Sequence, residues 1–404
     1  MHRSNIWLLI PLLKLPSLAQ ALNVSGKGYA EARQQERLTD APGRAPGQRY
    51  EALLEGQLAY SNLRFDGVFL GRYRSQYDVA DQELRDELGH EARLREYYLT
   101  WSADAFEIRV GRQQQAWGRA DYFRVVDVLN PLDLREFLLP YIDNYSLGRE
   151  PRMMLIADYF GDQWEHQLII APERDTTRLA PVGSDFAMSA MPAALPPGYK
   201  TGHGMDIGWR GKTFWQGRDV ELYAFHGYHS DAMVNVRNGN PVLEQPRRQF
   251  LGASLAQPWG DWVLRSDVAH YHQEGRQLSN GIQNSQRSTA LVGADRNKND
   301  WNLNLQVSAT HWYKDTDGDD TVLEGSVAVD KNWYQQRLNT SIIWLVNYQD
   351  NASQLWRANI RYNLFPQWEV AITAVLFDGK QSTLFGQFDQ QDRVMLTVRR
   401  NVSW

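Results

Sequence analysis

A strict alternation of apolar and polar residues limits the fold of this chain more than any other feature. In WNLNLQVSAT, residues 301–310, every odd-numbered residue is apolar and every even-numbered residue is polar. A period of two places the two kinds of side chain on opposite faces of a β-strand. The pattern recurs at 64–76, 321–332 and 353–363, and with a less polar second face at 367–377. We therefore expect many strands with one apolar and one polar face.

The segments that show strand character number about eighteen, with 16 as the alternative count, and the links between them alternate in length. Short links take turns with much longer ones along almost the whole chain, as in transmembrane β-barrels with tight turns at one end and long loops at the other. The predicted strands are 24–34, 51–61, 64–76, 92–102, 105–113, 151–160, 163–171, 204–213, 217–229, 248–257, 261–273, 287–296, 301–313, 321–332, 335–349, 353–363, 367–377 and 391–404.

Hydropathy and the needs of the backbone in lipid point to the same architecture. The mean hydropathy of −0.54 is too low for a bundle of membrane helices, because each such helix needs about 20 consecutive apolar residues. Every backbone N–H and C=O in lipid must pair internally, so a chain without such helices spans a membrane only as a closed barrel. The prediction is an all-β fold, an antiparallel transmembrane barrel whose apolar face meets lipid and whose polar face lines a lumen.

The N-terminus has the pattern of a secretory signal peptide. A basic start at Met1-His2-Arg3 precedes an apolar run from Ile6 to Leu13, and Ala19-Gln20-Ala21 is an A-x-A cleavage site. We expect a signal peptide at 1–21 and one barrel domain at 22–404. The chain contains no cysteine, which excludes disulfides, thiol catalysis and zinc sites with cysteine ligands.

The C-terminus agrees with this location. The last strand ends in Trp404, with Val402, Val398, Leu396 and Val394 on the same face. A terminal aromatic residue on an amphipathic strand resembles the recognition signal of bacterial outer-membrane barrels, which predicts contact with the barrel-assembly machinery and insertion into outer-membrane lipid. The alternative is a soluble all-β sandwich, propeller or solenoid, which the signal peptide, the alternating links and Trp404 disfavour.

The longest link, residues 114–150, is the most distinctive part of the chain. Asn130 is a suitable helix cap, Pro131 suits the first helical position and Asp133 favours the positive end of a helix, so a helix is predicted at about 131–139. Long ordered loops are usually functional. The segment is predicted to fold into the lumen and narrow it; the alternative is an external loop packed on the rim.

Part of this link carries a family resemblance over about 40 residues. The segment GRQQQAWGRADYFRVVDVLNPLDLRE resembles the hallmark of a largely uncharacterised proteobacterial outer-membrane β-barrel family, with more distant similarity to alginate-export-type porins. The resemblance implies the barrel fold and the membrane location, and it names no cargo. The matching residues are Gly111, Arg112, Gln113, Trp117, Gly118, Asp127, Asn130, Pro131 and Asp133.

The strand register predicts a charged lumen. Facing rows of opposite charge select solutes in a pore, so one interpretation is a conduit for a polar or anionic solute. The other is that the charges pair with one another and stiffen a filled barrel. The candidate lumen and constriction residues are Arg72, Arg74, Arg109, Arg119, Asp121, Arg124, Asp127, Asp133, Arg135, Arg265, Arg357 and Arg361.

Other chemistry has little support in the sequence. Asp315, Asp317 and Asp319 are spaced as in a calcium loop, but Ser326 stands where the loop needs its glutamate, so a solvated hairpin turn is favoured. No catalytic motif is present, and no cofactor is predicted. The net charge of −5 argues against nucleic acid as a partner.

The leading hypothesis is therefore a porin-like outer-membrane channel for a hydrophilic, anionic solute, narrowed by residues 114–150. The alternative is the outer-membrane component of an export system for polysaccharide or lipid-like cargo, with periplasmic or inner-membrane transport partners. A barrel enzyme is the third and weakest hypothesis.

Overall fold

The computed structural model describes residues 22–39, 47–75, 89–180, 184–188, 204–237, 240–278, 281–313, 321–348 and 352–404. The predicted signal peptide at 1–21 and the calcium candidates Asp315, Asp317 and Asp319 lie outside these ranges. None of the described helices is long and apolar enough to cross a membrane.

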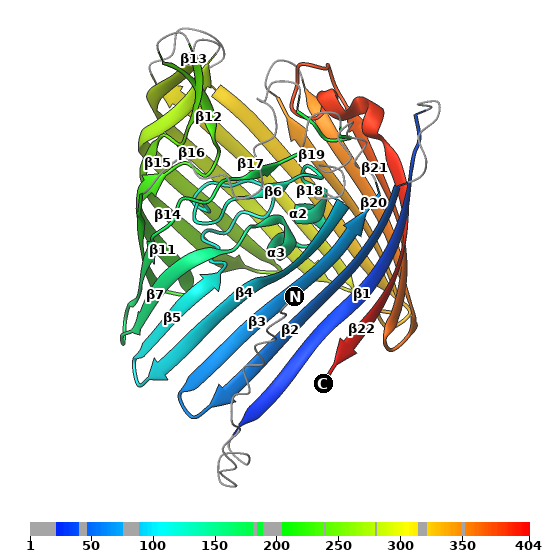
Figure 1. Ribbon diagram of the computed structural model, residues 1–404, viewed down its shortest axis with the longest axis horizontal. Helices are drawn as coiled ribbons and strands as arrows, with labels where there is room; N and C mark the ends of the chain where they lie inside the picture. Colours follow the sequence, from blue (N-terminus) through cyan, green and yellow to red (C-terminus); the bar gives the residue numbers. More distant parts are fainter. Residues whose placement is uncertain are drawn as a thin grey trace, which may run out of the picture.

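Eighteen strands form one antiparallel sheet that closes into a barrel (Figure 1). Each of the eighteen predicted strands is confirmed, with shifts at the ends. The strands are β1 (Asn23–Arg37), β2 (Gly47–Tyr60), β3 (Leu63–Arg74), β4 (His90–Ala103), β5 (Phe106–Gln113), β7 (Arg152–Phe160), β8 (Glu165–Ala171), β10 (Asp206–Trp215), β11 (Arg218–Tyr228), β14 (Arg247–Trp259), β15 (Trp262–Leu278), β16 (Gly281–Lys298), β17 (Trp301–Tyr313), β18 (Thr321–Trp333), β19 (Leu338–Asn347), β20 (Ser353–Phe365), β21 (Trp368–Asp378) and β22 (Arg393–Ser403).

The first and last strands close the cylinder. β1 pairs with β2 on one side and with β22 on the other, with Lys27 opposite Ser403 and Arg37 opposite Arg393. Beyond β22, the backbone N–H and C=O of Trp404 exchange two hydrogen bonds of 3.0 Å with Gly26. The barrel therefore has no free sheet edge, as a lipid environment requires.

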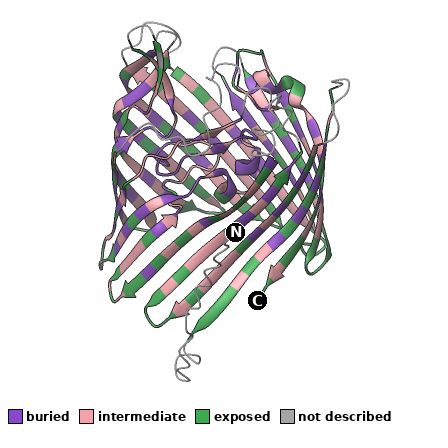
Figure 2. Ribbon diagram, viewed as in Figure 1, coloured by how far each residue is buried: buried purple, intermediate pink, exposed green. Residues whose placement is uncertain are grey.

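Along the strands, residues that face the lumen alternate with residues that face outward, as the period-two sequence pattern predicts (Figure 2). In β17 the side chain of Val307 is 62% exposed, whereas the neighbouring Gln306 and Ser308 are 2% exposed. The same outward exposure of large apolar residues recurs on strands around the barrel. Such a continuous apolar belt is foreign to a water-facing protein and fits a lipid-facing wall.

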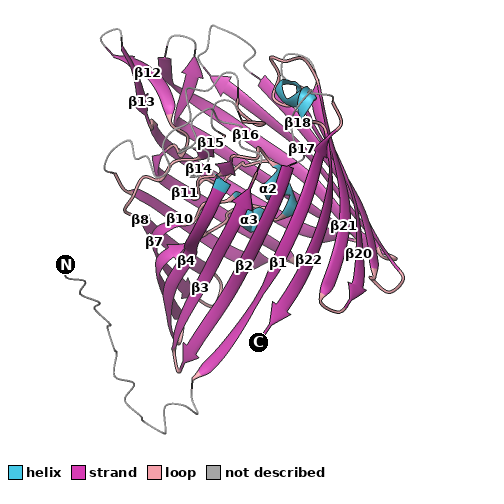
Figure 3. Cartoon of the chain, turned by 45° about the vertical axis from the view of Figure 1, so that its right-hand side comes forward, coloured by secondary structure: helices cyan, strands magenta, loops and turns pink. Residues whose placement is uncertain are grey.

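The two ends of the barrel differ (Figure 3). One end carries tight turns, such as Ser61–Asn62 and Gln216–Gly217, in which Ser61, Gln216 and Gly217 have positive φ. The other end carries the longer connections, with the hairpin β12 (Met233–Arg237) and β13 (Asn240–Glu244) and the 3-10 helix η1 (Gly386–Gln391). We call these the short-turn end and the long-loop end.

The connection between β5 and β7, residues 114–151, lies inside the barrel (Figure 1); we call it the lumen segment. It contains β6 (Asp133–Leu134), α2 (Leu139–Asp143) and α3 (Tyr145–Gly148). β6 pairs in parallel with β9 (Arg178–Leu179), from the β8–β10 connection.

The helix predicted at 131–139 is wrong. The backbone there pairs instead with other segments: Leu132 bridges Arg149, and β6 pairs with β9. The Asn130 side chain does not cap a helix; it accepts a hydrogen bond from the Gln115 N–H and donates one to the Glu150 carbonyl. Long-range pairing overrides the local capping signal, and helix begins at Leu139, with Pro140 in its first turn.

Candidate functional site

A carboxylate and a tyrosine of the barrel wall hold the start of the lumen segment. Asp267 of β15 accepts hydrogen bonds from the backbone N–H groups of Arg119 and Ala120, at 2.8 and 3.0 Å. The Tyr223 hydroxyl accepts one from the Gly118 N–H at 3.2 Å. Gly118 has φ of +87°, and a Cβ there would lie 2.6 Å from the Val126 side chain, so only glycine fits this turn.

An apolar anchor fixes this part of the segment to the wall formed by β7, β8, β11 and β14–β16. Trp117, Val125 and Val126 are at most 3% exposed and pack against rings and aliphatic side chains of these strands. The Tyr271 hydroxyl donates to the Val125 carbonyl at 2.5 Å. We call this contact the first apolar anchor; its wall residues include Tyr223, Phe225, Phe250, Tyr271 and Leu291.

A second apolar anchor lies on the wall formed by β18–β22. Phe137, with φ of +53°, is 2% exposed, and its ring centroid lies 4.6 Å from that of Phe388 and 6.2 Å from that of Phe377. Leu139 and Ile142 of α2 join the same cluster. A left-handed conformation at a bulky residue costs about 1–3 kcal/mol, which the burial of the aromatic ring offsets. The remaining wall residues of this anchor include Ile343, Leu345, Leu355, Val375 and Met395.

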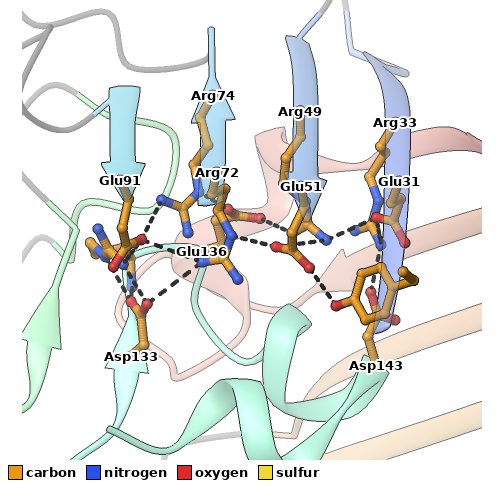
Figure 4. Close-up of polar contacts among 12 residues, drawn as sticks. Glu31, Arg33, Arg49, Glu51, Arg72, Arg74, Glu91, Asp133, Glu136 and Asp143 are labelled. Atoms are coloured by element: carbon orange, nitrogen blue, oxygen red, sulfur yellow. Dashed lines mark hydrogen bonds and ion pairs between the residues drawn. The ribbon is translucent and has the colours of Figure 1, made fainter. Parts of the chain in front are cut away.

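An ionic anchor joins the segment to β1–β4 and β20; Figure 4 shows the part formed with β1–β4. Glu136 binds the guanidinium groups of Arg49, at 3.1 Å, and Arg74. Asp143 binds Arg33, at 3.1 Å, and Arg357. On β4, Arg93 donates two parallel hydrogen bonds of 2.8 Å to the Glu150 carboxylate of the segment.

Burial and charge act against each other on these carboxyl groups. Burial alone would raise the pKa of the Glu136 carboxyl, but Arg49 and Arg74 outweigh it and hold that pKa at about 2. Burial opposes ionisation of Asp143 in the same way, and Arg357 and Arg33 hold its pKa well below the usual range. Glu136 and Asp143 are therefore charged at neutral pH, as their buried arginine partners require.

The remaining candidate charges are also paired. Arg72 binds Glu51, Arg109 binds Asp158 at 2.9 Å, and Arg361 lies 3.4 Å from Glu369. Within the segment and its wall, the pairs are Arg119–Glu221 (2.6 Å), Asp121–Arg265 (2.6 Å), Asp127–Arg149 (2.7 Å), Asp133–Arg135 (2.6 Å) and Arg135–Glu91 (2.9 Å). Arg124 lies 3.8 Å from Asp127 and donates to the Asn130 carbonyl at 2.7 Å. The interpretation that the lumen charges pair with one another describes this arrangement.

The residues of the family-like motif shape the entry of the segment into the lumen. A Cβ on Gly111, which has φ of +143°, would lie 2.3 Å from the Tyr97 carbonyl. Gln113 donates to the Met154 carbonyl at 3.2 Å, and the Trp117 indole N–H donates to Gln167 at 3.1 Å. Arg112 lies 3.7 Å from Asp175.

The second half of the motif closes the segment on itself. Asn130 is fully buried, and its two hydrogen bonds, both 2.8 Å, join Gln115 to Glu150. The Pro131 carbonyl accepts from the Glu150 N–H at 2.8 Å. The motif is therefore a set of backbone constraints on the lumen segment.

Sequence reasoning missed several residues of the ionic anchor. Arg33 and Arg49 lie on β1 and β2, where each has only one small or apolar neighbour, Ala32 and Tyr50, and a glutamine on the other side, so the alternation that marks an inward residue is weak there. Nothing local marks Arg95, whose guanidinium donates to the carbonyls of Ser146 and Arg149. In the described ranges, no three His, Asp or Glu side chains are grouped to hold a metal ion.

A closed eighteen-strand barrel with a segment folded into its lumen is the architecture of an outer-membrane porin. The chain belongs to the family described as "Protein of unknown function (DUF1302)", whose model matches residues 21–402. No curated protein matches the sequence. The relation to alginate-export-type porins stays a prediction.

Solved structures share the fold at low identity. Pseudomonas aeruginosa OpdK with vanillate has 13% identity and a TM-score of 0.58, covering 95% of this chain and 99% of that chain. Pseudomonas aeruginosa OccK2 (OpdF) in complex with glucuronate has 11% identity and a TM-score of 0.52, covering 95% and 98%. Acinetobacter baumannii OccAB1 has 10% identity and a TM-score of 0.56, covering 95% and 96%. These similarities identify the fold.

Proposed function

We propose that this protein is a channel for the passive passage of small hydrophilic anions across the outer membrane, with the lumen segment as its constriction. The observation that carries the proposal is the attachment of that segment to three parts of the wall, by two apolar anchors and one ionic anchor. A segment held in this way reduces the bore permanently, and an eighteen-strand barrel without it leaves an aqueous channel.

Hollow space on both sides of the segment supports passage. Towards the short-turn end, a cavity of about 460 Å³ is lined by Lys27, Glu55, Gln57, Asp66 and Tyr98. On the other side, a cavity of about 400 Å³ lies between the segment and the long-loop end. A barrel filled for stability alone has no need of polar cavities above and below its filling.

The preference for anions rests on arginine. The lumen holds the arginines described above at and around the constriction, and arginine binds carboxylates with two parallel hydrogen bonds. The fold relatives OpdK and OccK2 were solved with the organic anions vanillate and glucuronate. Both observations favour an organic acid over a cation as the solute.

The location and maturation follow from the same proposal. The signal peptide is cleaved after Ala21, and the short-turn end faces the periplasm, as in outer-membrane barrels. Trp404 lies at that end, where its indole occupies the space left by Gly26; a Cβ on Gly26 would lie 2.2 Å from the ring. Before β1 pairs with β22, Gly26 does not cover the indole, and Trp404 is available to the assembly machinery.

Planar-bilayer recording of the purified barrel tests the proposal. The intact protein is expected to give small, anion-selective channels, measured by the reversal potential in a salt gradient. A variant with residues 119–147 replaced by a short glycine-serine linker is expected to give a severalfold larger conductance. Absence of channels in both proteins rejects the proposal, and cation selectivity of the intact protein rejects its anionic part.

A further inference from the structure

The cavity on the long-loop side of the lumen segment has an excess of positive charge. Its lining includes four arginines and three carboxylates, contributed by the segment, the β11–β12 connection and β14–β17. Its volume, about 400 Å³, lies in the range of small-molecule sites. The charged lining residues are Arg124, Arg248, Arg276, Arg287, Asp127, Asp231 and Glu274, with His229 beside them.

The carboxylates of this cavity are already occupied. Glu274 is 1% exposed and accepts two hydrogen bonds of 2.7 Å from Arg248 and one of 3.2 Å from Arg287. Asp127 accepts two hydrogen bonds, at 2.9 and 2.7 Å, from Arg149, which is not among the lining residues. Asp231 lies 3.5 Å from the His229 ring nitrogen Nδ1.

Arg124 has donor capacity that these pairs do not use. One of its terminal N–H groups donates to the Asn130 carbonyl at 2.7 Å, and its Nε lies 3.8 Å from Asp127. That Nε is buried and has no hydrogen-bond partner among the described residues. The Arg124 side chain as a whole is 22% exposed, so the outer part of its guanidinium can donate to an anion in the cavity.

One wall of the cavity is flat and aromatic. The guanidinium of Arg276 lies 5.0 Å from the centroid of the Trp312 ring, and that of Arg287 lies 5.5 Å from the same ring. Arg287 also lies 3.8 Å over the Tyr271 ring. Cations and rings therefore alternate along the wall, and a planar apolar group can pack on the Trp312 indole beside a cation.

We propose that this cavity is a capture site for a ring-bearing organic acid, which it binds before passage. The carboxylate lies against Arg124 and the net positive lining, and the flat ring lies against Trp312. The inference rests on the proposed channel function for its purpose, but binding itself does not require an open channel.

Calorimetric titration of the purified full-length barrel in detergent tests the site, with benzoate as the probe. Acetate carries the charge without the ring, and benzyl alcohol carries the ring without the charge. We expect benzoate to bind about tenfold more tightly than either, because each half of the site contributes a charge-assisted or a stacking contact. Equal affinity for benzoate and acetate overturns the proposal.

Two variants test separately the carboxylate-binding half of the site, at Arg124, and the ring-binding half, at Trp312. Arg124→Gln is expected to weaken benzoate binding about tenfold, and Trp312→Leu to weaken benzoate but not acetate. Arg296→Gln, at the short-turn end of β16 in an exposed pair with Asp261, is the matched control and leaves affinity unchanged. Heat-modifiable gel migration establishes that each variant is folded. If folded Arg124→Gln binds benzoate like the wild type, the site is refuted.

The two proposals fail in different ways. A barrel that binds benzoate in detergent but gives no channel in bilayers refutes the channel and keeps the site. An anion-selective channel without benzoate binding refutes the site and keeps the channel.

Discussion

The apolar and ionic anchors of the lumen segment hold the same chain by different physics. Phe137 and its ring neighbours exclude water from the β18–β22 wall, and their contribution scales with buried area. Glu136 and Asp143, on the β1–β3 and β20 side, lose their hydration and gain buried ion pairs with arginine. The free-energy cost of removing the charges from water is close to the gain from the ion pairs. The apolar anchors therefore supply net stability, whereas the ionic anchor depends on both partners being present and charged.

The difference also explains why so many arginines line the wall. Without the lumen segment, Arg49 and Arg74 would lose their shared partner Glu136, and Arg33 and Arg357 would lose Asp143. The wall would then present more uncompensated positive charge to the bore, although Arg33 and Arg49 would keep Glu31 and Arg74 would keep Glu91. The segment thus sets both the diameter of the lumen and the fraction of its positive charge that a solute meets.

The largest single effect is expected at the second apolar anchor. Phe137→Ala removes a buried ring and should cost about 3–5 kcal/mol of local stability, releasing α2 from the β18–β22 wall. Hydrogen exchange of residues 133–143 and denaturant unfolding measure the loss. Phe365→Ala, at an outward residue that is 67% exposed, is the matched control and should leave exchange of the segment unchanged. Unaltered exchange in Phe137→Ala would contradict the anchor.

Breaking the ionic anchor should come next. Glu136→Gln removes a shared counter-charge from the buried Arg49 and Arg74, which keep Glu31 and Glu91 at 3.2 and 3.5 Å, and it should cost about 3 kcal/mol. Glu165→Gln, in an exposed pair with Lys212, should cost at most about 1 kcal/mol. Unfolding midpoints of the two variants provide the measurement. Equal losses in both would show that burial of the pair does not matter.

Acid should separate the two kinds of anchor. The pKa of the Glu136 carboxyl is about 2 in the folded protein, below its ordinary value of 4.5. A lowered carboxyl pKa gives stability that is present above about pH 4.5 and is lost as the pH falls towards 2, on the order of 3 kcal/mol.

The wild type and Glu136→Gln should therefore converge in stability over this pH range, while Phe137→Ala keeps its deficit. Unfolding curves at several pH values between 7 and 2 test this. A gap between wild type and Glu136→Gln that stays constant with pH would refute the assignment.

The smallest effect is expected at the hydrogen bonds that hold the start of the segment. Asp267→Asn keeps the shape but weakens acceptance from the Arg119 and Ala120 N–H groups, at a cost of about 1–2 kcal/mol. Faster exchange of these two amides is the predicted readout. Protection as in the wild type would show that Asp267 is not their essential acceptor.

The barrel was predictable from the sequence because the signal for each strand lies within that strand's own residues. Each strand carries its own period-two pattern, so all eighteen strands were found, including 24–34 and 287–296, which have the weakest alternation. The closure of β1 on β22 followed from the even number of strands and the absence of any tolerated edge in lipid. Errors were confined to the strand ends, where turns set the boundary.

The path of the lumen segment was not predictable in the same way. Its contacts join residues far apart in sequence, such as Asp143 with Arg357 and Arg119 with Asp267. The Asn130-Pro131 pattern predicted a helix because the pattern is local, but the pairing of β6 with β9 and the bonds of Asn130 depend on the folded whole. The strand register predicted which charged side chains point inward, but the sequence did not predict which residues they form ion pairs with.

Cross-linking tests most directly the central claim that the lumen segment crosses the bore and reaches the opposite wall. The chain has no cysteine of its own, so a pair introduced as Asp143→Cys and Arg357→Cys can be joined by a short bifunctional thiol reagent in intact membranes. The account predicts a cross-link for this pair and none for Asp143→Cys with Asp158→Cys on β7. No cross-link between 143 and 357 in a barrel that migrates as folded would contradict it.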